Sequence, residues 1–125
     1  MKKKILIAED TRLIATAIYD QLSSDFEVTL CFDGKQAASR ALEESFDLIV
    51  TDIVMPEMDG IELARVLRNQ EATKDIPIIA LSTKAEDMLN AETRRQFAAY
   101  LVKPFGLDEL PRIVHDILGG VGAAQ

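Results

Sequence analysis

The chain has 125 residues, of which 48% are apolar, and a formal net charge of -7. This length suits one domain with one hydrophobic core, and no apolar run approaches the ~20 residues that a membrane-spanning helix needs. The acidic balance argues against nucleic acid as a direct partner, and the single cysteine excludes an internal disulfide. The apolar run after Lys4 is too short for a signal peptide, so we expect a cytoplasmic protein.

Apolar runs of strand length alternate with segments of helical periodicity along the chain. The predicted strands are Lys4 to Ala8, Glu27 to Phe32, Asp47 to Thr51, Ile76 to Leu81 and Ala99 to Val102. The predicted helices run from a cap at Asp10 or Thr11 to Leu22, over Ala37 to Leu42, from Gly60 to Gln70, from Glu86 to Phe97 and from Leu107 to Leu118. Glycines end the last helix, which predicts one domain over residues 1–118 and a flexible tail over residues 119–125.

This alternation predicts an α/β fold, a doubly wound five-stranded parallel sheet with helices on both faces. We expect the flavodoxin-like strand order 2-1-3-4-5, because the first, third and fourth strands are the most uniformly apolar. The second strand alternates Val28, Leu30 and Phe32 with Glu27, Thr29 and Cys31, which favours an edge position. The helix over 86–97 has the weakest apolar stripe, so we expect it to be the least firmly packed.

Acidic residues follow two strands that this order makes neighbours. Glu9 and Asp10 come after the first strand, and Asp52 ends the third. The crevice between such strands is where α/β folds place their chemistry. Crowded carboxylates need a cation, and oxygen ligands of this kind suit Mg²⁺. Glu9 and Asp10 alone could merely cap the following helix, but adding Asp52 favours a metal site.

A hydroxyl and a lysine follow the two remaining strands of the same rim. Ser82 comes after the fourth strand and Lys103-Pro104 after the fifth, and the latter bond can be cis. Each residue also has a simpler interpretation: Ser82 as an ordinary turn serine, and Lys103 as a solvated lysine before a turn proline. Together they suit a carboxylate that accepts a phosphoryl group, with Lys103 and Mg²⁺ balancing its charge and Ser82 donating to a phosphoryl oxygen.

These pieces, in this order, resemble the response regulator receiver domains of two-component signalling over about Lys4 to Leu118. The matching pieces are Glu9-Asp10, the segment TDIVMPEMDG around Asp52, Ser82 after PIIAL, and KPF from Lys103. The resemblance implies a (βα)5 receiver fold with Asp52 as phosphoacceptor and Ser82 and Lys103 as switch hydroxyl and phosphate-sensing lysine. It also implies Mg²⁺ bound by Glu9, Asp10, Asp52 and the Val54 carbonyl, and Tyr100 as switch aromatic. Without the resemblance, Tyr100 is better interpreted as a half-buried edge-strand tyrosine.

The function that the resemblance implies is a signalling switch rather than an enzyme, although the domain would catalyse its own phosphorylation and dephosphorylation. A sensor histidine kinase or histidine phosphotransfer protein would donate the phosphoryl group. The face of the fourth helix, fifth strand and fifth helix would then change its affinity for a downstream protein. Two alternatives stay open: a degenerate receiver that binds proteins constitutively and a Mg²⁺-dependent aspartyl phosphatase. The latter lacks the expected Asp-x-Asp pair, since Ile53 and Val54 follow Asp52.

The chain also departs from the family pattern. The interval from Ser82 to Lys103 is about one residue shorter than usual. The segment from Gln96 to Tyr100 also contains no glycine, where many relatives have a Gly-Ala step. We therefore expect an altered fourth helix or an altered exit from it. Thr11 stands where a third acidic or amide residue is frequent, and Thr83 replaces a small alanine.

Overall fold

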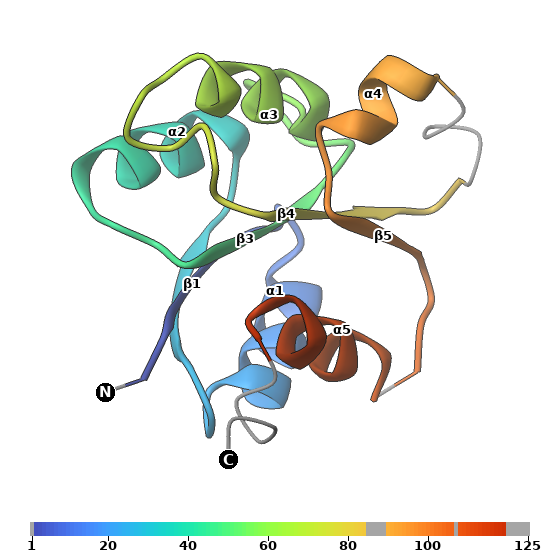
Figure 1. The fold of residues 1–125 in the computed structure, drawn as a ribbon. Coiled ribbons are helices and arrows are strands. Elements are labelled where there is room, and N and C mark those ends of the chain that lie inside the picture. The colour runs from blue at the N-terminus through green and yellow to red at the C-terminus, as the bar shows by residue number, and fades with distance from the viewer. Residues whose placement is uncertain (1, 85–89, 107, 120–125) are drawn as a thin grey trace.

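The computed structural model describes residues 2–84, 90–106 and 108–119, in which a parallel sheet lies between two layers of helices (Figure 1). The strands are β1 (Lys4–Ala8), β2 (Glu27–Cys31), β3 (Leu48–Asp52), β4 (Ile78–Ser82) and β5 (Ala99–Val102). The helices are α1 (Arg12–Leu22), α2 (Gly34–Glu43), α3 (Gly60–Arg68), α4 (Ala91–Arg95) and α5 (Glu109–Ile117). The observed order β2-β1-β3-β4-β5, with all neighbours parallel, confirms the predicted topology.

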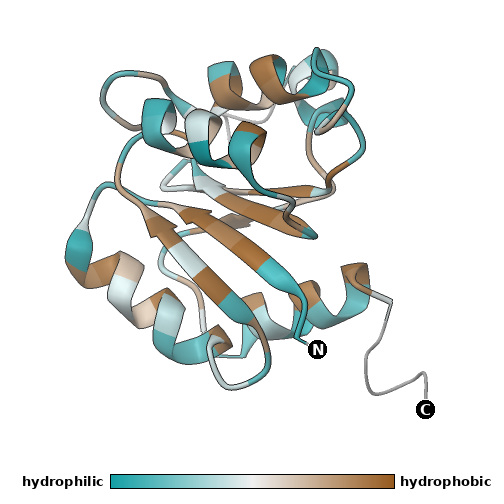
Figure 2. Ribbon diagram, turned by 90° about the vertical axis from the view of Figure 1, so that its left-hand side faces the viewer, coloured by the Kyte–Doolittle hydropathy of each residue, from teal (hydrophilic) through white to brown (hydrophobic). Residues whose placement is uncertain are grey.

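The central strands are buried on both faces because helices cover both. α1 and α5 lie on one side of the sheet and α2, α3 and α4 on the other (Figure 1). Side chains of β1 alternate between two cores: Leu6 packs with residues of α2 and α3, and Ile5 and Ile7 pack with residues of α1 and α5. Figure 2 shows the result, with apolar strands inside and polar residues on the outer faces of the helices. This pattern is what continuous apolar runs in a parallel sheet predict.

β2 lies at the edge of the sheet, as its alternating sequence predicted, but the apolar residues of that alternation are not its most buried ones. Cys31 is the buried residue of the strand, whereas Val28 and Leu30 are only partly buried. The reason is that helices cover both faces of this edge: Cys31 packs into the core under α2, and Val28 and Leu30 pack toward α1. The strand also ends at Cys31, since the backbone N–H of Phe32 donates to the Gln36 side chain instead (3.0 Å).

Most other boundaries differ by one or two residues from those predicted, whereas α2 begins at Gly34, three residues before the predicted Ala37. β3 extends through Asp52, and β4 begins at Ile78, after Pro77. α3 begins where expected because Asp59 and Glu62 form a reciprocal capping box, and it ends at Arg68 rather than at Gln70. These shifts leave every predicted site residue at the same edge of the sheet.

Three predictions reach residues that the structure leaves undescribed. The start of the fourth helix at Glu86, the start of the fifth at Leu107 and most of the tail over 119–125 lie outside the described residues. The described part of the fourth helix, α4, ends at Arg95, before the predicted Phe97, and none of its five residues is buried. α4 therefore agrees with the expected weak packing. Within the described ranges, no helix combines the length and the apolarity needed to cross a membrane.

Candidate functional site

The site is built from the carboxyl ends of β1 and β3. The parallel register pairs Ala8 with Thr51, so Glu9 and Asp52 leave adjacent strands side by side. Glu9 is fully buried, Asp52 is 7% exposed and Asp10 is exposed. One carboxylate oxygen from each of the three residues lies within 4.8 Å of the other two. The structure thus gathers the three acidic residues that the sequence placed at neighbouring strand ends.

Lys103 reaches this cluster from the opposite end of the chain. Its backbone N–H donates to the Ser82 carbonyl (2.7 Å), which continues the pairing of β5 with β4. Its Nζ donates to Glu9 Oε1 (2.9 Å) and to Asp52 Oδ2 (3.0 Å), and its side chain is only 13% exposed. The peptide bond from Lys103 to Pro104 is cis. Lys103 is therefore not the solvated lysine of the alternative interpretation.

The charges at this edge of the sheet are unequal. Among the described residues that meet here, one ammonium group faces three carboxylates. The pKa of Asp52 is raised from 3.8 to about 6, chiefly by burial. This net value already includes the hydrogen bond from Lys103, which lowers the pKa, and the nearby charges of Glu9 and Asp10, which raise it. Burial would lower the pKa of Lys103, but its hydrogen bonds to Glu9 and Asp52 outweigh that effect and raise it. The site as it stands therefore favours an additional positive charge.

Glu9 has a second contact that concerns the start of α1. Thr11 is the N-cap of this helix, but its side chain makes no capping hydrogen bond within the described residues. Instead the Thr11 backbone N–H donates to Glu9 Oε2 (3.0 Å). Glu9 thus both joins the acidic cluster and satisfies a backbone donor next to the helix, so the two interpretations considered for it are compatible.

The remaining predicted residues surround the cluster. Ser82 is the buried last residue of β4, and its Oγ donates to the Lys84 carbonyl (2.9 Å) and accepts from the Lys84 N–H (3.0 Å). Val54 lies two residues after β3 and is 70% exposed. Tyr100 is paired with Ala80 across β4 and β5, and its side chain is 42% exposed. Ser82 directly follows Leu81, which pairs with Asp52 across β3 and β4, so its hydroxyl lies at the strand end next to the acidic cluster.

Gly60 shapes the loop that follows Asp52, a role that the turn signal in the sequence did not specify. Its N–H donates to the Ile53 carbonyl (2.8 Å), which folds the start of α3 back onto the strand end. A Cβ atom at this position would lie 2.2 Å from the Asp52 carbonyl oxygen, so no other residue fits without a backbone shift. The sequence marked a turn here, but only the structure shows that the turn packs on Asp52 itself.

The acidic cluster fits a hard divalent cation. Two oxygens on opposite sides of a Mg²⁺ ion lie ~4.2 Å apart, slightly less than the 4.8 Å within which the three oxygens lie. Adjacent oxygens around the ion lie ~3 Å apart, so direct binding by all three carboxylates needs them to rotate closer together, and a carboxylate that stays farther away can bind through one of the waters that Mg²⁺ ordinarily keeps. The donor set, which is all oxygen and carries excess negative charge, suits this ion.

Comparison with known proteins gives a consistent answer. The family model of the response regulator receiver domain matches residues 5–115. The chain is 36% identical over 122 residues to the alkaline phosphatase synthesis transcriptional regulatory protein PhoP of Bacillus subtilis (strain 168), covering 94% of this chain and 49% of PhoP. The chain thus spans about half the length of the curated regulators it matches.

Two solved structures extend the comparison. The receiver domain of the sensor histidine kinase PA1611 from Pseudomonas aeruginosa PAO1 has a TM-score of 0.84 and 34% identity, with 95% of this chain and 99% of that chain covered. That domain has a magnesium ion coordinated in its active site cleft. The response regulator TrrA from Thermotoga maritima, in complex with Mg²⁺-BeF, has a TM-score of 0.83 and 28% identity, with coverage of 92% and 98%.

Proposed function

The chain belongs to the response regulator receiver domain family of two-component signalling, and from this premise we propose that it is a phosphorylation-dependent switch with Asp52 as phosphoacceptor. The observation that carries the proposal is the position of Asp52, with Lys103 at 3.0 Å and Glu9 and Asp10 beside it. A carboxylate placed in this way can attack phosphorus when cations offset the charge that the transferred group brings.

The acidic cluster would hold Mg²⁺ through Glu9, Asp10, Asp52 and the carbonyl oxygen of Val54. Asp10 and Asp52 would coordinate the ion directly. The oxygens of Glu9 already accept from Thr11 and Lys103, so Glu9 would act through a bound water. When bound, Mg²⁺ neutralises charge that develops on the phosphoryl oxygens. The magnesium ion of the PA1611 receiver domain supports this assignment.

In the transfer step, a carboxylate oxygen of Asp52 would form a bond to phosphorus while the bond from phosphorus to the donor's imidazole nitrogen breaks. The electron pair of the broken bond stays on the ring, which leaves as imidazole after protonation. Lys103 offsets part of the roughly two negative charges that a phosphoryl group adds, and Ser82 donates a hydrogen bond to one of its oxygens. Positioning and electrostatics supply the catalysis, because the protein itself needs no further covalent chemistry.

The switch would operate through Ser82 and Tyr100. Ser82 would exchange its hydrogen bonds with Lys84 for one to the phosphoryl group, and the half-exposed Tyr100 would turn inward. The face formed by α4, β5 and α5 would then change its affinity for a downstream protein, which is a shift between two populated states. The donor would be a sensor histidine kinase or a histidine phosphotransfer protein.

The test is intact-mass measurement after incubation with acetyl phosphate and Mg²⁺. We expect one phosphoryl adduct on the wild type and none on Asp52→Ala or in EDTA. Asp20→Ala, which removes an exposed aspartate of α1, is the matched control and should keep the adduct. A persistent adduct on the Asp52→Ala variant would refute the assignment of the phosphoacceptor. Sustained release of phosphate from a phosphomonoester would instead indicate a phosphatase.

If the phosphoryl adduct is too short-lived to be detected by mass, beryllofluoride provides a second test, because it binds without turnover. The chain has two tyrosines and no tryptophan, so a Tyr19→Phe background leaves Tyr100 as the fluorescent reporter. We expect its emission to change when beryllofluoride and Mg²⁺ are added together, and not with either alone. If neither the adduct nor this response occurs, the chain is a constitutive binding module and not a switch.

A further inference from the structure

One guanidinium group joins the end of α3 to two other segments of the chain. Arg68, the last residue of α3, donates from Nη1 to the carbonyl oxygens of Lys74 (3.0 Å) and Ile76 (2.7 Å). Its Nη2 donates to the carbonyl oxygen of Gln96 (2.6 Å), the C-cap residue of α4, 28 residues along the chain. The planar fork of arginine allows one side chain to bond both segments at once, which a lysine cannot do.

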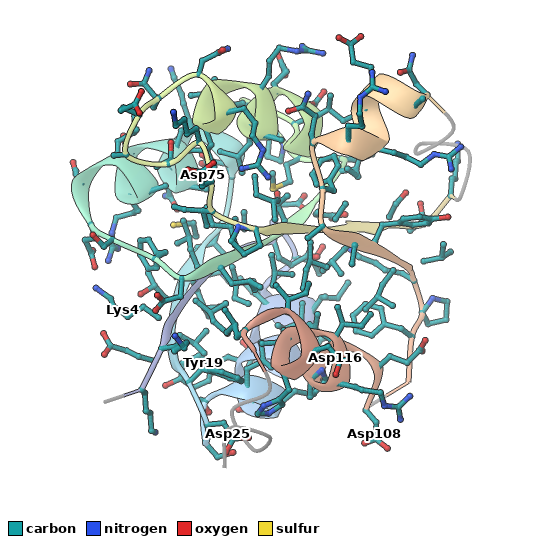
Figure 3. The ribbon with its side chains drawn as sticks, in the orientation of Figure 1. Lys4, Tyr19, Asp25, Asp75, Asp108 and Asp116 are labelled. Atoms are coloured by element: carbon teal, nitrogen blue, oxygen red, sulfur yellow. The ribbon has the colours of Figure 1, made fainter. Side chains whose placement is uncertain are left out.

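The environment of Arg68 makes these bonds strong. The side chain is half-buried, and burial lowers its pKa, an effect that Asp75 partly opposes. Asp75 lies in the connection between α3 and β4, on the side of the sheet that carries α2 and α3 (Figure 3). Arginine stays protonated in proteins, so its charge is compensated here mainly by backbone carbonyl dipoles. Hydrogen bonds from a charged donor are stronger than neutral ones.

The end of α4 is exposed but continues into segments that contact the sheet, since the Ala98 N–H donates to the Ile78 carbonyl of β4 (2.8 Å). None of its residues, Ala91–Arg95, is buried. Phe97, two residues after the helix, packs on the buried pair Ile53 and Ala80. Ile53 directly follows the acceptor Asp52, and Ala80 precedes Ser82 by two residues. The segment at the end of α4 therefore has two contacts. Phe97 packs on residues next to the proposed phosphorylation site, and Gln96 accepts a hydrogen bond from Arg68 of α3.

A small pocket lies between α3 and α4 and reaches the anchored residue Gln96. A small cavity of about 120 Å³ separates α3 from α4, between Ile61 and Arg65 on one side and Asn90, Glu92, Thr93 and Gln96 on the other. Since one water occupies ~30 Å³ of liquid volume, this space holds a few waters. Side chains therefore do not fill all of the space between α3 and α4 beside Arg65 and Thr93.

From these contacts we propose that Arg68 is a positioning residue that anchors the C-terminal end of α4, about which α4 turns when the site around Asp52 changes. This role rests on the proposed switch function, because it concerns how that switch reaches α4. A change at Asp52 reaches Phe97 through Ile53. With Gln96 held by Arg68, the helix turns about this end instead of detaching from α3.

The experiment compares Arg68→Met and Arg68→Lys with Thr73→Val. Thr73 donates its buried hydroxyl to the Leu67 carbonyl (2.7 Å), so its variant also weakens the connection after α3 but touches no residue of α4. The readouts are amide exchange and chemical shifts of Arg94, Gln96 and Phe97 by NMR, with and without Mg²⁺ and beryllofluoride. Phosphoryl adduct formation with acetyl phosphate is measured in parallel.

In Arg68→Met we expect amide exchange at Gln96 and Phe97 to be at least tenfold faster than in the wild type before any addition. Their beryllofluoride-dependent shifts should fall by more than half, while the rate of adduct formation stays within about twofold. Arg68→Lys should lie between the two, and Thr73→Val should leave both readouts at wild-type values.

Equal effects of Arg68→Met and Thr73→Val on exchange would overturn the anchoring, and an undiminished beryllofluoride response in Arg68→Met would overturn the pivot. A wild type that does not respond to beryllofluoride would refute the proposed function, and with it the turning of α4. The exchange rates before addition would still decide whether Arg68 anchors the helix.

Discussion

Replacing Asp52 by asparagine should stabilise the metal-free protein, although it removes the proposed phosphoacceptor. The carboxyl has its pKa raised from 3.8 to about 6 by burial, with Glu9 and Asp10 adding to the rise. A raised carboxyl pKa means that the folded state prefers the neutral form. The stability that this group contributes is full below pH 3.8 and is lost as the pH rises through 6. At neutral pH the ionised carboxylate of Asp52 therefore destabilises the folded state of the wild type.

The size of the effect follows from the pKa. A rise from 3.8 to about 6 corresponds to about 3 kcal/mol at pH 7.5. The attraction of Lys103 is already contained in this figure, because the hydrogen bond from Lys103 lowers the pKa from a still higher value. Asparagine has the shape of the protonated acid, so Asp52→Asn should recover most of the difference at pH 7.5 and only about 1 kcal/mol at pH 4.5.

The assay is urea unfolding followed by far-ultraviolet circular dichroism, in EDTA, at pH 7.5 and pH 4.5. Asp20→Asn, at an exposed position of α1, is the matched control and should change stability by less than about 0.5 kcal/mol at either pH. Saturating Mg²⁺ should stabilise the wild type more than Asp52→Asn. The reasoning is refuted if Asp52→Asn is less stable than the wild type at pH 7.5. It is also refuted if the gain is the same at both pH values.

Three further substitutions and one control, Gly106→Ala, test the site and its scaffold by urea unfolding. Lys103→Met should destabilise the metal-free protein by about 3 kcal/mol, because it leaves buried carboxylates without their ammonium partner; a neutral result would contradict the ion pairs. Gly60→Ala should cost about 2–3 kcal/mol, since its Cβ would meet the Asp52 carbonyl. Gly106→Ala, where the nearest atom would be 3.5 Å away, should be tolerated. Asp33→Ala should cost about 1 kcal/mol by removing the α2 cap.

The sheet could be predicted because its strands carry strong and simple signals. Continuous apolar runs such as Leu48 to Val50 occur where helices cover both faces of a strand, and right-handed crossovers leave few possible orders. Lys103 and Glu9 are 94 residues apart, yet their meeting was predictable, because both follow parallel strands whose carboxyl ends share one edge. Strand ends therefore place the main residues of the site without any long-range information.

Other features depend on contacts that leave no pattern in the sequence. The burial of Cys31 depends on which helix covers the edge strand, and the alternation in β2 does not reveal this. The hydrogen bonds of Arg68 to Lys74, Ile76 and Gln96 all go to backbone carbonyls, which any residue type supplies. The anchoring role proposed for Arg68 therefore could not be predicted from the sequence. The alteration expected in the fourth helix from the short interval before Lys103 stays a prediction.

The unequal charges of the site also determine the order in which its ligands can bind. Glu9, Asp10 and Asp52 face the single ammonium of Lys103 among the described residues gathered there. Adding a phosphoryl group brings roughly two more negative charges to a site that burial already makes unfavourable for Asp52. Lys103 alone cannot balance that sum, so we expect a divalent cation to bind before or with the phosphoryl group. The adduct should therefore form at a rate that saturates with Mg²⁺ concentration, and it should not form in EDTA.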